Sequence, residues 1–188
     1  CLTMEHLPTQ HEDLPYPACE YEGREIETNT IGADGLTPPH RDLLAHDTDM
    51  TSTLESFFEE AMRLQVLHMR VEGDVMFRQV LLVGNDSERV AEFGAIYIDL
   101  SLFDAIPRHL IEEGRVPLGA ILRDQGIVCQ SSPTGFLQLV AGDSMGRLLG
   151  CDSGTALYGR RNVLSMPTGE DFAHIVEILP DLSAEAKP

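Results

Sequence analysis

The order of the expected elements indicates an α+β protein with a mainly antiparallel β-sheet and helices packed on it. The strand candidates are joined by short polar turns, which fit hairpins between antiparallel strands. The helical patterns come in groups instead of alternating with single strands, which argues against a βαβ arrangement. At 188 residues with 43% hydrophobic side chains, the chain is long enough for one domain with a substantial core.

The first 36 residues are rich in proline, glycine and acidic side chains and show no sustained hydrophobic period. We therefore expect residues 1–36 to form an acidic tail that is mobile or loosely docked. A single folded domain is expected over residues 37–182, and a short C-terminal tail over residues 183–188.

Two helix starts are expected before the first strand. Thr37-Pro38-Pro39 is typical of a helix start, and Leu43 and Leu44 would then face the core. Ser52-Thr53-Leu54-Glu55 has the pattern of a capping box at the start of a second helix. The apolar stripe of that helix would consist of Leu54, Phe57, Phe58, Ala61 and Met62.

Three strand candidates follow, at Leu64–Val71, Val75–Val83 and Ala91–Leu100. They are separated by Glu72-Gly73-Asp74 and by Gly84-Asn85-Asp86-Ser87, which are turn compositions. These links are too short for crossover connections, so the three strands are expected to form antiparallel hairpins.

In the second half of the chain, the sequence pattern predicts three helices and three strands. In order, these are a helix over Ser101–Glu113 ended by Gly114, a helix opened by Val116-Pro117-Leu118-Gly119 and closed by Gly126, a strand around Phe136–Val140, a short helix over Asp143–Leu149, and two strands over Thr155–Leu164 and Phe172–Leu179.

Two charged residues lie in rows of strand positions that are otherwise apolar. Glu177 shares a pleated face with Ile175 and Leu179, and Arg78 shares one with Val80. A buried charge is costly unless it is paired, protonated or bound to a ligand. Three interpretations stay open: Glu177 turns out into water at the strand end, the two residues form a structural ion pair, or they flank a ligand with an anionic end and a hydroxyl end.

Composition excludes several classes of function. The formal net charge of −18 makes nucleic acid and anionic membrane surfaces unfavourable partners. Lys187 is the only lysine, so a Schiff-base mechanism, with or without pyridoxal phosphate, is not expected. The four cysteines form no C-x-x-C pair, which argues against a zinc site and fits a reducing cytoplasm. No apolar run reaches the ~18 residues that a membrane-spanning helix needs.

Five short motifs occur in order and together resemble the chorismate pyruvate-lyases, also called 4-hydroxybenzoate synthases. They are DLLAHDTDMTSTLE (Asp42–Glu55), FRQVLL (Phe77–Leu82), VPLGAIL (Val116–Leu122), LYGRRNVL (Leu157–Leu164) and IVEILP (Ile175–Pro180). Each motif is weak alone, but their order and spacing make the resemblance specific. It runs from about Asp42 to Pro180 and gives no information on residues 1–36.

The resemblance implies an antiparallel sheet with a closed ligand pocket under helical flaps, and conversion of chorismate to 4-hydroxybenzoate and pyruvate without a metal or organic cofactor. By position, Arg78 resembles the arginine that holds the ring carboxylate, and the backbone amide of Leu118 resembles its helper. Glu177 resembles the carboxylate that meets the ring hydroxyl, and Met50 resembles a residue that lines the pocket through its backbone. Arg78 and Glu177 are thus the expected catalytic pair, and Met50 and Leu118 are expected to bind substrate or product.

Arg160 and Arg161 match the GRR motif of the family and are also expected at the ligand site. Three roles remain open for them: guiding the substrate into the pocket, binding the enolpyruvyl carboxylate, or stabilising the hairpin. An arginine near the departing enolpyruvyl group would stabilise the charge that develops there.

A chorismate lyase is the expected function, and an aromatic-carboxylate-binding, sensor-like protein of the same fold is the alternative. The ligand-binding domains of bacterial helix-turn-helix repressors resemble this fold too, whereas the GRR motif favours the lyases. Another small-molecule enzyme on this fold is a third possibility. The protein is expected to be a cytoplasmic monomer, and its product would serve quinone synthesis or a secondary metabolite.

Overall fold

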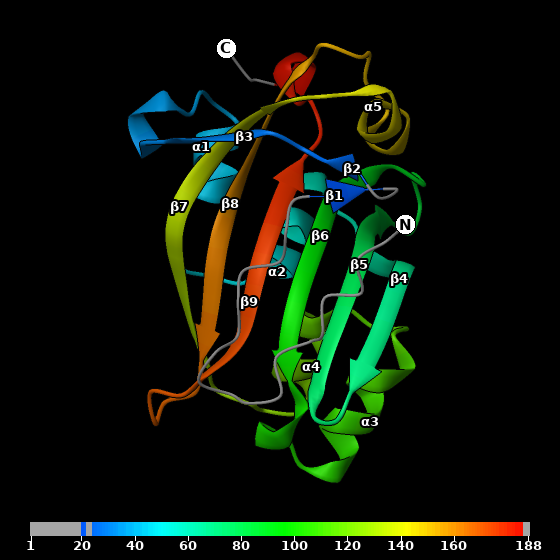
Figure 1. Ribbon diagram of the computed structural model, residues 1–188, viewed down its shortest axis with the longest axis vertical. Coiled ribbons are helices and arrows are strands. Elements are labelled where there is room, and N and C mark those ends of the chain that lie inside the picture. The colour runs from blue at the N-terminus through cyan, green and yellow to red at the C-terminus, as the bar shows by residue number, and fades with distance from the viewer. Residues whose placement is uncertain (1–19, 22–23, 186–188) are drawn as a thin grey trace.

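The computed structural model describes residues 20–21 and 24–185, and side chains from residue 26 onward. Its main feature is a seven-stranded antiparallel sheet with the strand order β3-β7-β8-β9-β6-β5-β4 (Figure 1). The strands are β3 (Thr28–Ile31), β4 (Met62–Glu72), β5 (Val75–Gly84), β6 (Val90–Asp99), β7 (Gln130–Val140), β8 (Ala156–Ser165) and β9 (Asp171–Leu179). The α+β class and the antiparallel sheet predicted from the sequence are confirmed.

The sheet begins earlier in the chain than the sequence indicated. Thr28–Ile31 pairs with β7 at the edge of the sheet, and Leu36 is fully buried. The expected boundary at residue 36 therefore falls inside the folded unit, because an edge strand of four residues with two exposed side chains carries little hydrophobic signal. Upstream, β1 (Glu20–Tyr21) and β2 (Arg24–Glu25) form a separate two-stranded pair, and residues 1–19 and 22–23 of the expected tail lie outside the described residues.

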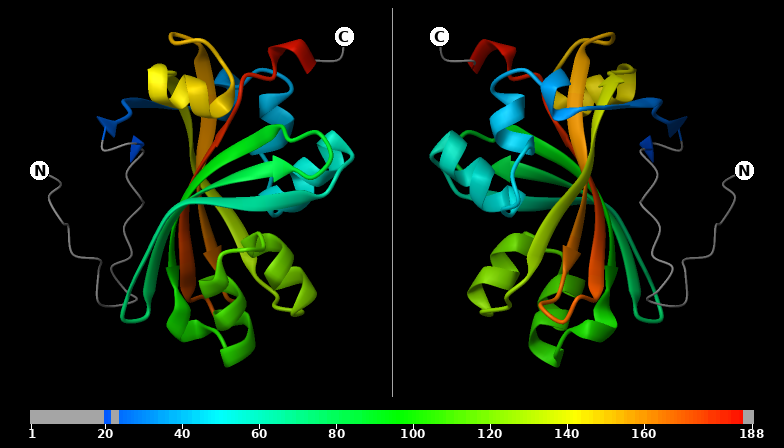
Figure 2. Two further views of the ribbon diagram at one scale, coloured as in Figure 1. Left: turned by 90° about the vertical axis from the view of Figure 1, so that its right-hand side faces the viewer. Right: turned by 90° about the vertical axis from the view of Figure 1, so that its left-hand side faces the viewer.

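The larger helices lie on the two faces of the sheet. They are α1 (His40–Leu44), α2 (Met50–Phe58), α3 (Ala105–Glu113), α4 (Leu118–Asp124) and α5 (Asp143–Leu149), with 3₁₀ turns at η2 (Ala33–Gly35), η3 (Leu100–Leu102) and η4 (Ser183–Glu185). Figure 2 shows α1 to α4 on one side of the twisted sheet and α5 on the other. Within the described part of the chain, none of these helices has the length and apolar content to cross a membrane.

The second helix starts two residues before the expected capping box. Asp49 is its N-cap, and the Asp49 side chain accepts a hydrogen bond from the backbone N–H of Ser52 at 2.8 Å. The helix ends at Phe58, so Met62 belongs to β4 and not to the helical stripe. Glu55 also does not close a capping box; its carboxylate accepts from the backbone N–H of Met62. The capping-box prediction was wrong because Asp49 offers an equally good cap one turn earlier.

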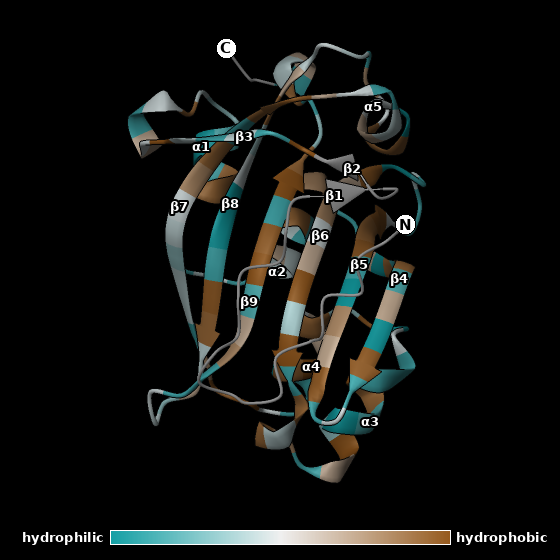
Figure 3. Ribbon diagram, viewed as in Figure 1, coloured by the Kyte–Doolittle hydropathy of each residue, from teal (hydrophilic) through white to brown (hydrophobic). Residues whose placement is uncertain are grey.

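Hydrophobic clusters cover both faces of the sheet. The cluster under α5 includes Met145 and Val176, and the opposite face carries one cluster around Ile121 of α4 and another around Leu54 of α2. Figure 3 shows β5, β6 and β9 as mostly hydrophobic, whereas β8 contains a longer hydrophilic segment. The polar residues of the candidate site therefore sit in the middle of an apolar sheet, between the α2 and α4 clusters.

Candidate functional site

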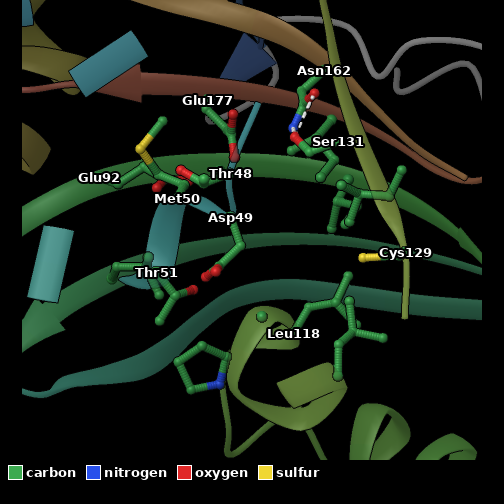
Figure 4. A pocket seen from close by; sticks show the side chains of 18 of the residues that line it. Thr48, Asp49, Met50, Thr51, Glu92, Leu118, Cys129, Ser131, Asn162 and Glu177 are labelled. Atoms are coloured by element: carbon green, nitrogen blue, oxygen red, sulfur yellow. Dashed lines mark hydrogen bonds between the residues drawn. The ribbon is translucent and has the colours of Figure 1, made fainter. Parts of the chain in front are cut away.

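A cavity of about 450 Å³ lies between the sheet and the helices α2 and α4. This volume is in the usual range for small-ligand pockets. Its floor comes from alternate residues of β5, β6, β8 and β9, and its cover comes from the loop before α2 and the start of α4. Figure 4 shows Glu92, Met50 and Glu177 gathered on one side of the cavity and Leu118 on the other.

Arg78 provides a buried positive charge in the lining of the cavity. Its side chain is only 1% exposed, and no carboxylate among the described residues forms an ion pair with it. Its Nη1 donates one long hydrogen bond of 3.4 Å to the carbonyl of Ile111, and its Nε has no partner in the described part of the chain. Burial lowers the pKa of Arg78 to about 10, which leaves it charged at neutral pH. Such an arginine has free donors for an anion.

Glu177 lines the same cavity but is paired with a different arginine. Arg160 on the neighbouring strand β8 donates from Nε to Oε2 of Glu177, and both residues are buried. The ion pair between Arg78 and Glu177 that the sequence left open does not form. Arg160 pairs with Oε2 of Glu177, and the carboxyl group also lines the cavity, where it can accept a hydrogen bond from a ligand.

Arg160 also fastens the loop that covers the cavity. Its Nη1 donates to the carbonyls of Leu44 at 3.1 Å and His46 at 2.9 Å, and its Nη2 donates to the carbonyl of Thr48 at 3.5 Å. Burial and the nearby Arg160 lower the pKa of His46, so this histidine stays neutral within the loop. The covering loop and the charged acceptor therefore depend on one guanidinium group.

A second carboxyl group, Glu92 on β6, also lines the cavity. It is 5% exposed, and its Oε2 has no hydrogen-bond partner among the described residues. Burial and, secondly, the charge of Glu177 raise the pKa of Glu92 well above its ordinary value, although Arg160 opposes this. Glu92 is a cavity residue that was not among those predicted from the sequence. The rule that identified Glu177 also fits here, since Glu92 alternates with Gly94 and Ile96 in a buried strand.

Gly94 forms the open floor between these charged groups. It pairs with Val80 on β5 and with Glu177 on β9, so it occupies the centre of the row. A Cβ atom at this position would lie 3.1 Å from Oε1 of Glu92 and 3.3 Å from Cγ2 of Val80. Even a methyl group at this position would therefore crowd the lining of the cavity.

The cover of the cavity brings together the other two residues that the resemblance indicated. Met50 begins α2 and Leu118 begins α4, and both are buried in the cavity lining. The two helices approach closely at Gly119, where a Cβ atom would lie 2.6 Å from Oδ1 of Asp49. Arg123 of α4 also donates to the hydroxyl of Ser52 in α2 at 2.9 Å.

Two polar side chains at the remaining edge of the cavity form a hydrogen bond with each other. Asn162 of β8 donates from Nδ2 to the hydroxyl of Ser131 at 3.0 Å, as Figure 4 shows, and this pair is buried. Cys129 lies nearby as a free thiol, and burial together with the charge of Asp49 raises its pKa. A thiol with a raised pKa is a poor nucleophile.

The six residues expected at the site fall into three groups. Arg78, Glu177, Met50 and Leu118 line the cavity together. Arg160 is buried behind Glu177 and acts through it, and it does not belong to the lining. Arg161 lies on the other face of β8, because it alternates with Arg160 and pairs with Val176 of the α5-covered cluster.

Comparisons with known proteins relate the fold to regulator ligand-binding domains. The effector domain of PhnF from Mycobacterium smegmatis is 11% identical and superposes with a TM-score of 0.53 over 71% of this chain and 88% of that one. A PhnF structure from the same organism gives 11% identity and a TM-score of 0.54 over 70% of this chain and 63% of that one. The ligand-binding domain of a putative GntR-family regulator from Bordetella bronchiseptica gives 12% identity and a TM-score of 0.49 over 63% and 85%.

No protein-family model matches the chain, and no curated protein matches it. At these identities the PhnF structures establish a shared fold only. The chain is thus an α+β domain that shares the fold of the PhnF effector domain and has a cavity lined by Arg78, Glu92 and Glu177.

Proposed function

We propose that this protein binds a small aromatic carboxylate in the cavity, with the carboxylate at Arg78 and a hydroxyl group at Glu177. The observation that carries the proposal is the buried guanidinium of Arg78, whose Nε has no partner in the described chain. A ligand carboxylate would complete its hydrogen bonds and compensate its burial. The mostly apolar lining between the two charged ends suits a ring.

The charges of the cavity favour a ligand with one negative charge. The described lining contains four carboxyl groups, at Asp47, Asp49, Glu92 and Glu177, but only two guanidinium groups, at Arg78 and Arg123. Arg123 is half exposed and already donates to Ser52. A second anionic group on the ligand would therefore meet mainly acidic side chains. The effector-domain fold of PhnF also supports binding as the function.

Chorismate pyruvate-lyase activity is the second candidate. It is favoured by the arrangement of Arg78, Glu177, Met50 and Leu118 around one cavity, which fits the roles implied by the resemblance. Chorismate is a dianion, however, and its enolpyruvyl carboxylate needs its own cation. Arg160 is engaged with Glu177 and the covering loop, and Arg161 lies on the other face of the sheet. This arrangement makes binding the better-supported function.

Calorimetric titration tests the proposal with 4-hydroxybenzoate and 4-hydroxybenzyl alcohol as a matched ligand pair. We expect 4-hydroxybenzoate to bind and the alcohol, which lacks the carboxylate, to bind at least ~30-fold more weakly. Arg78→Met should abolish the difference. Arg108→Met is the matched control, because Arg108 forms surface ion pairs with Asp74 and Glu112 and does not line the cavity.

Incubation with chorismate separates the two candidates. Release of pyruvate and 4-hydroxybenzoate in equal amounts, with loss in Arg78→Met and Glu177→Gln, would establish the lyase. Intact chorismate together with Arg78-dependent binding of 4-hydroxybenzoate would establish the binding function. If neither ligand binds and chorismate is unchanged, both candidates are wrong.

A further inference from the structure

Glu92 is a buried carboxyl group that the proposed contacts to a carboxylate and a single hydroxyl do not use. Its side chain points into the cavity lining, and its Oε2 has no partner within the described residues. An unsatisfied polar atom in a buried site costs free energy unless a ligand or water completes it. Glu92 therefore requires an explanation beyond the packing of β6.

Glu92 and Glu177 share the nearby positive charge of Arg160. Arg160 donates to Glu177 and to the carbonyls of the covering loop, and it donates no hydrogen bond to Glu92. Two buried carboxylates that share one nearby cation cannot both stay ionised without a large cost. Because Glu177 holds the cation, Glu92 is the group that takes the proton, and the direction of its pKa shift agrees.

We propose that Glu92 is a second ligand-binding carboxyl group, a neutral hydrogen-bond donor beside the charged acceptor Glu177, and that the ligand carries two adjacent oxygen functions opposite its carboxylate. The 3,4-dihydroxybenzoates are the chemical class that this arrangement fits. This inference rests on the proposed binding function and identifies its specificity-determining residue.

The two carboxyl groups would form different hydrogen bonds with the two oxygens of the ligand. The 4-hydroxyl donates to the Glu177 carboxylate, and the adjacent oxygen accepts from the Glu92 O–H. Gly94 is two residues from Glu92 along β6 and pairs with Glu177 on β9, so the two carboxyl groups lie on the same face of the sheet as neighbours of Gly94. A ligand with a single hydroxyl leaves the Glu92 donor unsatisfied, which lowers its affinity.

Calorimetry with 4-hydroxybenzoate and 3,4-dihydroxybenzoate tests the inference in the full chain. We expect the dihydroxy ligand to bind about tenfold more tightly to the wild type. Glu92→Gln should keep most of this preference, because its amide still donates a hydrogen bond. Glu92→Leu should lose the preference, because its side chain cannot donate a hydrogen bond to the second oxygen.

Infrared spectroscopy tests the protonation of Glu92 without a ligand. At pH 7 the wild type should show the C=O stretch of a protonated carboxylic acid, and Glu92→Gln should lack it. Equal affinity for the two benzoates, or absence of this band, overturns the inference while the proposed function stands. If neither benzoate binds, both the proposed function and the proposed ligand class are wrong. Equal binding of the two benzoates, by contrast, excludes only the ligand class.

Discussion

Arg160 and Glu177 form an ion pair across the neighbouring strands β8 and β9, in the interior of the protein. Their side chains are 0% and 6% exposed, so water screens the pair little. The same guanidinium holds the covering loop through the carbonyls of Leu44 and His46. The acceptor end of the cavity and the position of its cover are therefore set by one residue.

Replacing Arg160 should destabilise the fold strongly. Arg160→Met leaves Glu177 as a buried carboxylate without its cation and leaves three backbone carbonyls without their donor. We expect a loss on the order of 3–5 kcal/mol in the free energy of unfolding, measured by urea denaturation.

The double variant Arg160→Met/Glu177→Gln should recover part of that loss, because no unpaired buried charge remains. Arg161→Met is the matched control on the opposite face of β8, and it should cost clearly less. Equal losses for Arg160→Met and Arg161→Met would contradict the role given to the Arg160–Glu177 pair.

Replacing Arg78 should have the opposite effect on stability from replacing Arg160. Burial lowers its pKa to about 10, so at neutral pH the folded chain carries the full cost of keeping this arginine charged. The cost is present below about pH 10 and is relieved as pH rises above this value. Arg78→Met should therefore raise the unfolding free energy of the ligand-free protein at pH 7, by on the order of 1–3 kcal/mol. Thermal unfolding measures the change.

Arg108→Met should show no such gain, since Arg108 lies in surface ion pairs and its removal changes stability little. A clear destabilisation by Arg78→Met would mean that the arginine stabilises the fold and is not kept for a ligand.

The stability of the protein should depend on pH through Glu92. Its folded pKa is raised well above the ordinary value of 4.5, so the folded chain binds a proton that the unfolded chain has released. By linkage, stability then falls as pH rises above about 4.5, and it stops falling once the folded pKa is passed. The loss is at most on the order of 1 kcal/mol per pH unit.

Glu92→Gln removes this titration while keeping the shape of the side chain. We expect the unfolding free energy of Glu92→Gln to exceed that of the wild type by more at pH 7 than at pH 5. Denaturant titration at both pH values measures this difference. A gain that is constant over this range would show that Glu92 ionises normally in the folded protein.

Gly94 should be required for binding more than for folding. The Cβ of Gly94→Ala would enter the cavity floor and press on Glu92 and Val80 at 3.1 and 3.3 Å. We expect the affinity for 4-hydroxybenzoate to fall at least about tenfold in calorimetry, with a modest change in the unfolding temperature. Gly135→Ala in β7 is the control, because its Cβ would meet only Thr30, at 3.9 Å. Equal losses of affinity in both variants would contradict the placement of the ligand.

Local sequence patterns were sufficient to predict most of the helices and strands. Alternation and turn residues predicted the hairpin strands β4 to β6, and Gly114 ends α3 with a positive φ of 64°, as its position indicated. The second helix was placed too late because two caps, Asp49 and Ser52, compete within one turn. The edge strand β3 was missed because its signal depends on pairing with residues more than a hundred positions away.

The sequence by itself determined the fold class and the two charged residues Arg78 and Glu177, because a charge in a buried apolar row violates a local rule that needs no partner to be recognised. Only the tertiary structure decided which charges meet. Strand order places Arg160 beside Glu177, turns Arg161 to the other face and brings Glu92 to the same cavity. These relationships depend on register between strands far apart in the chain, and a one-residue change in register would reverse them.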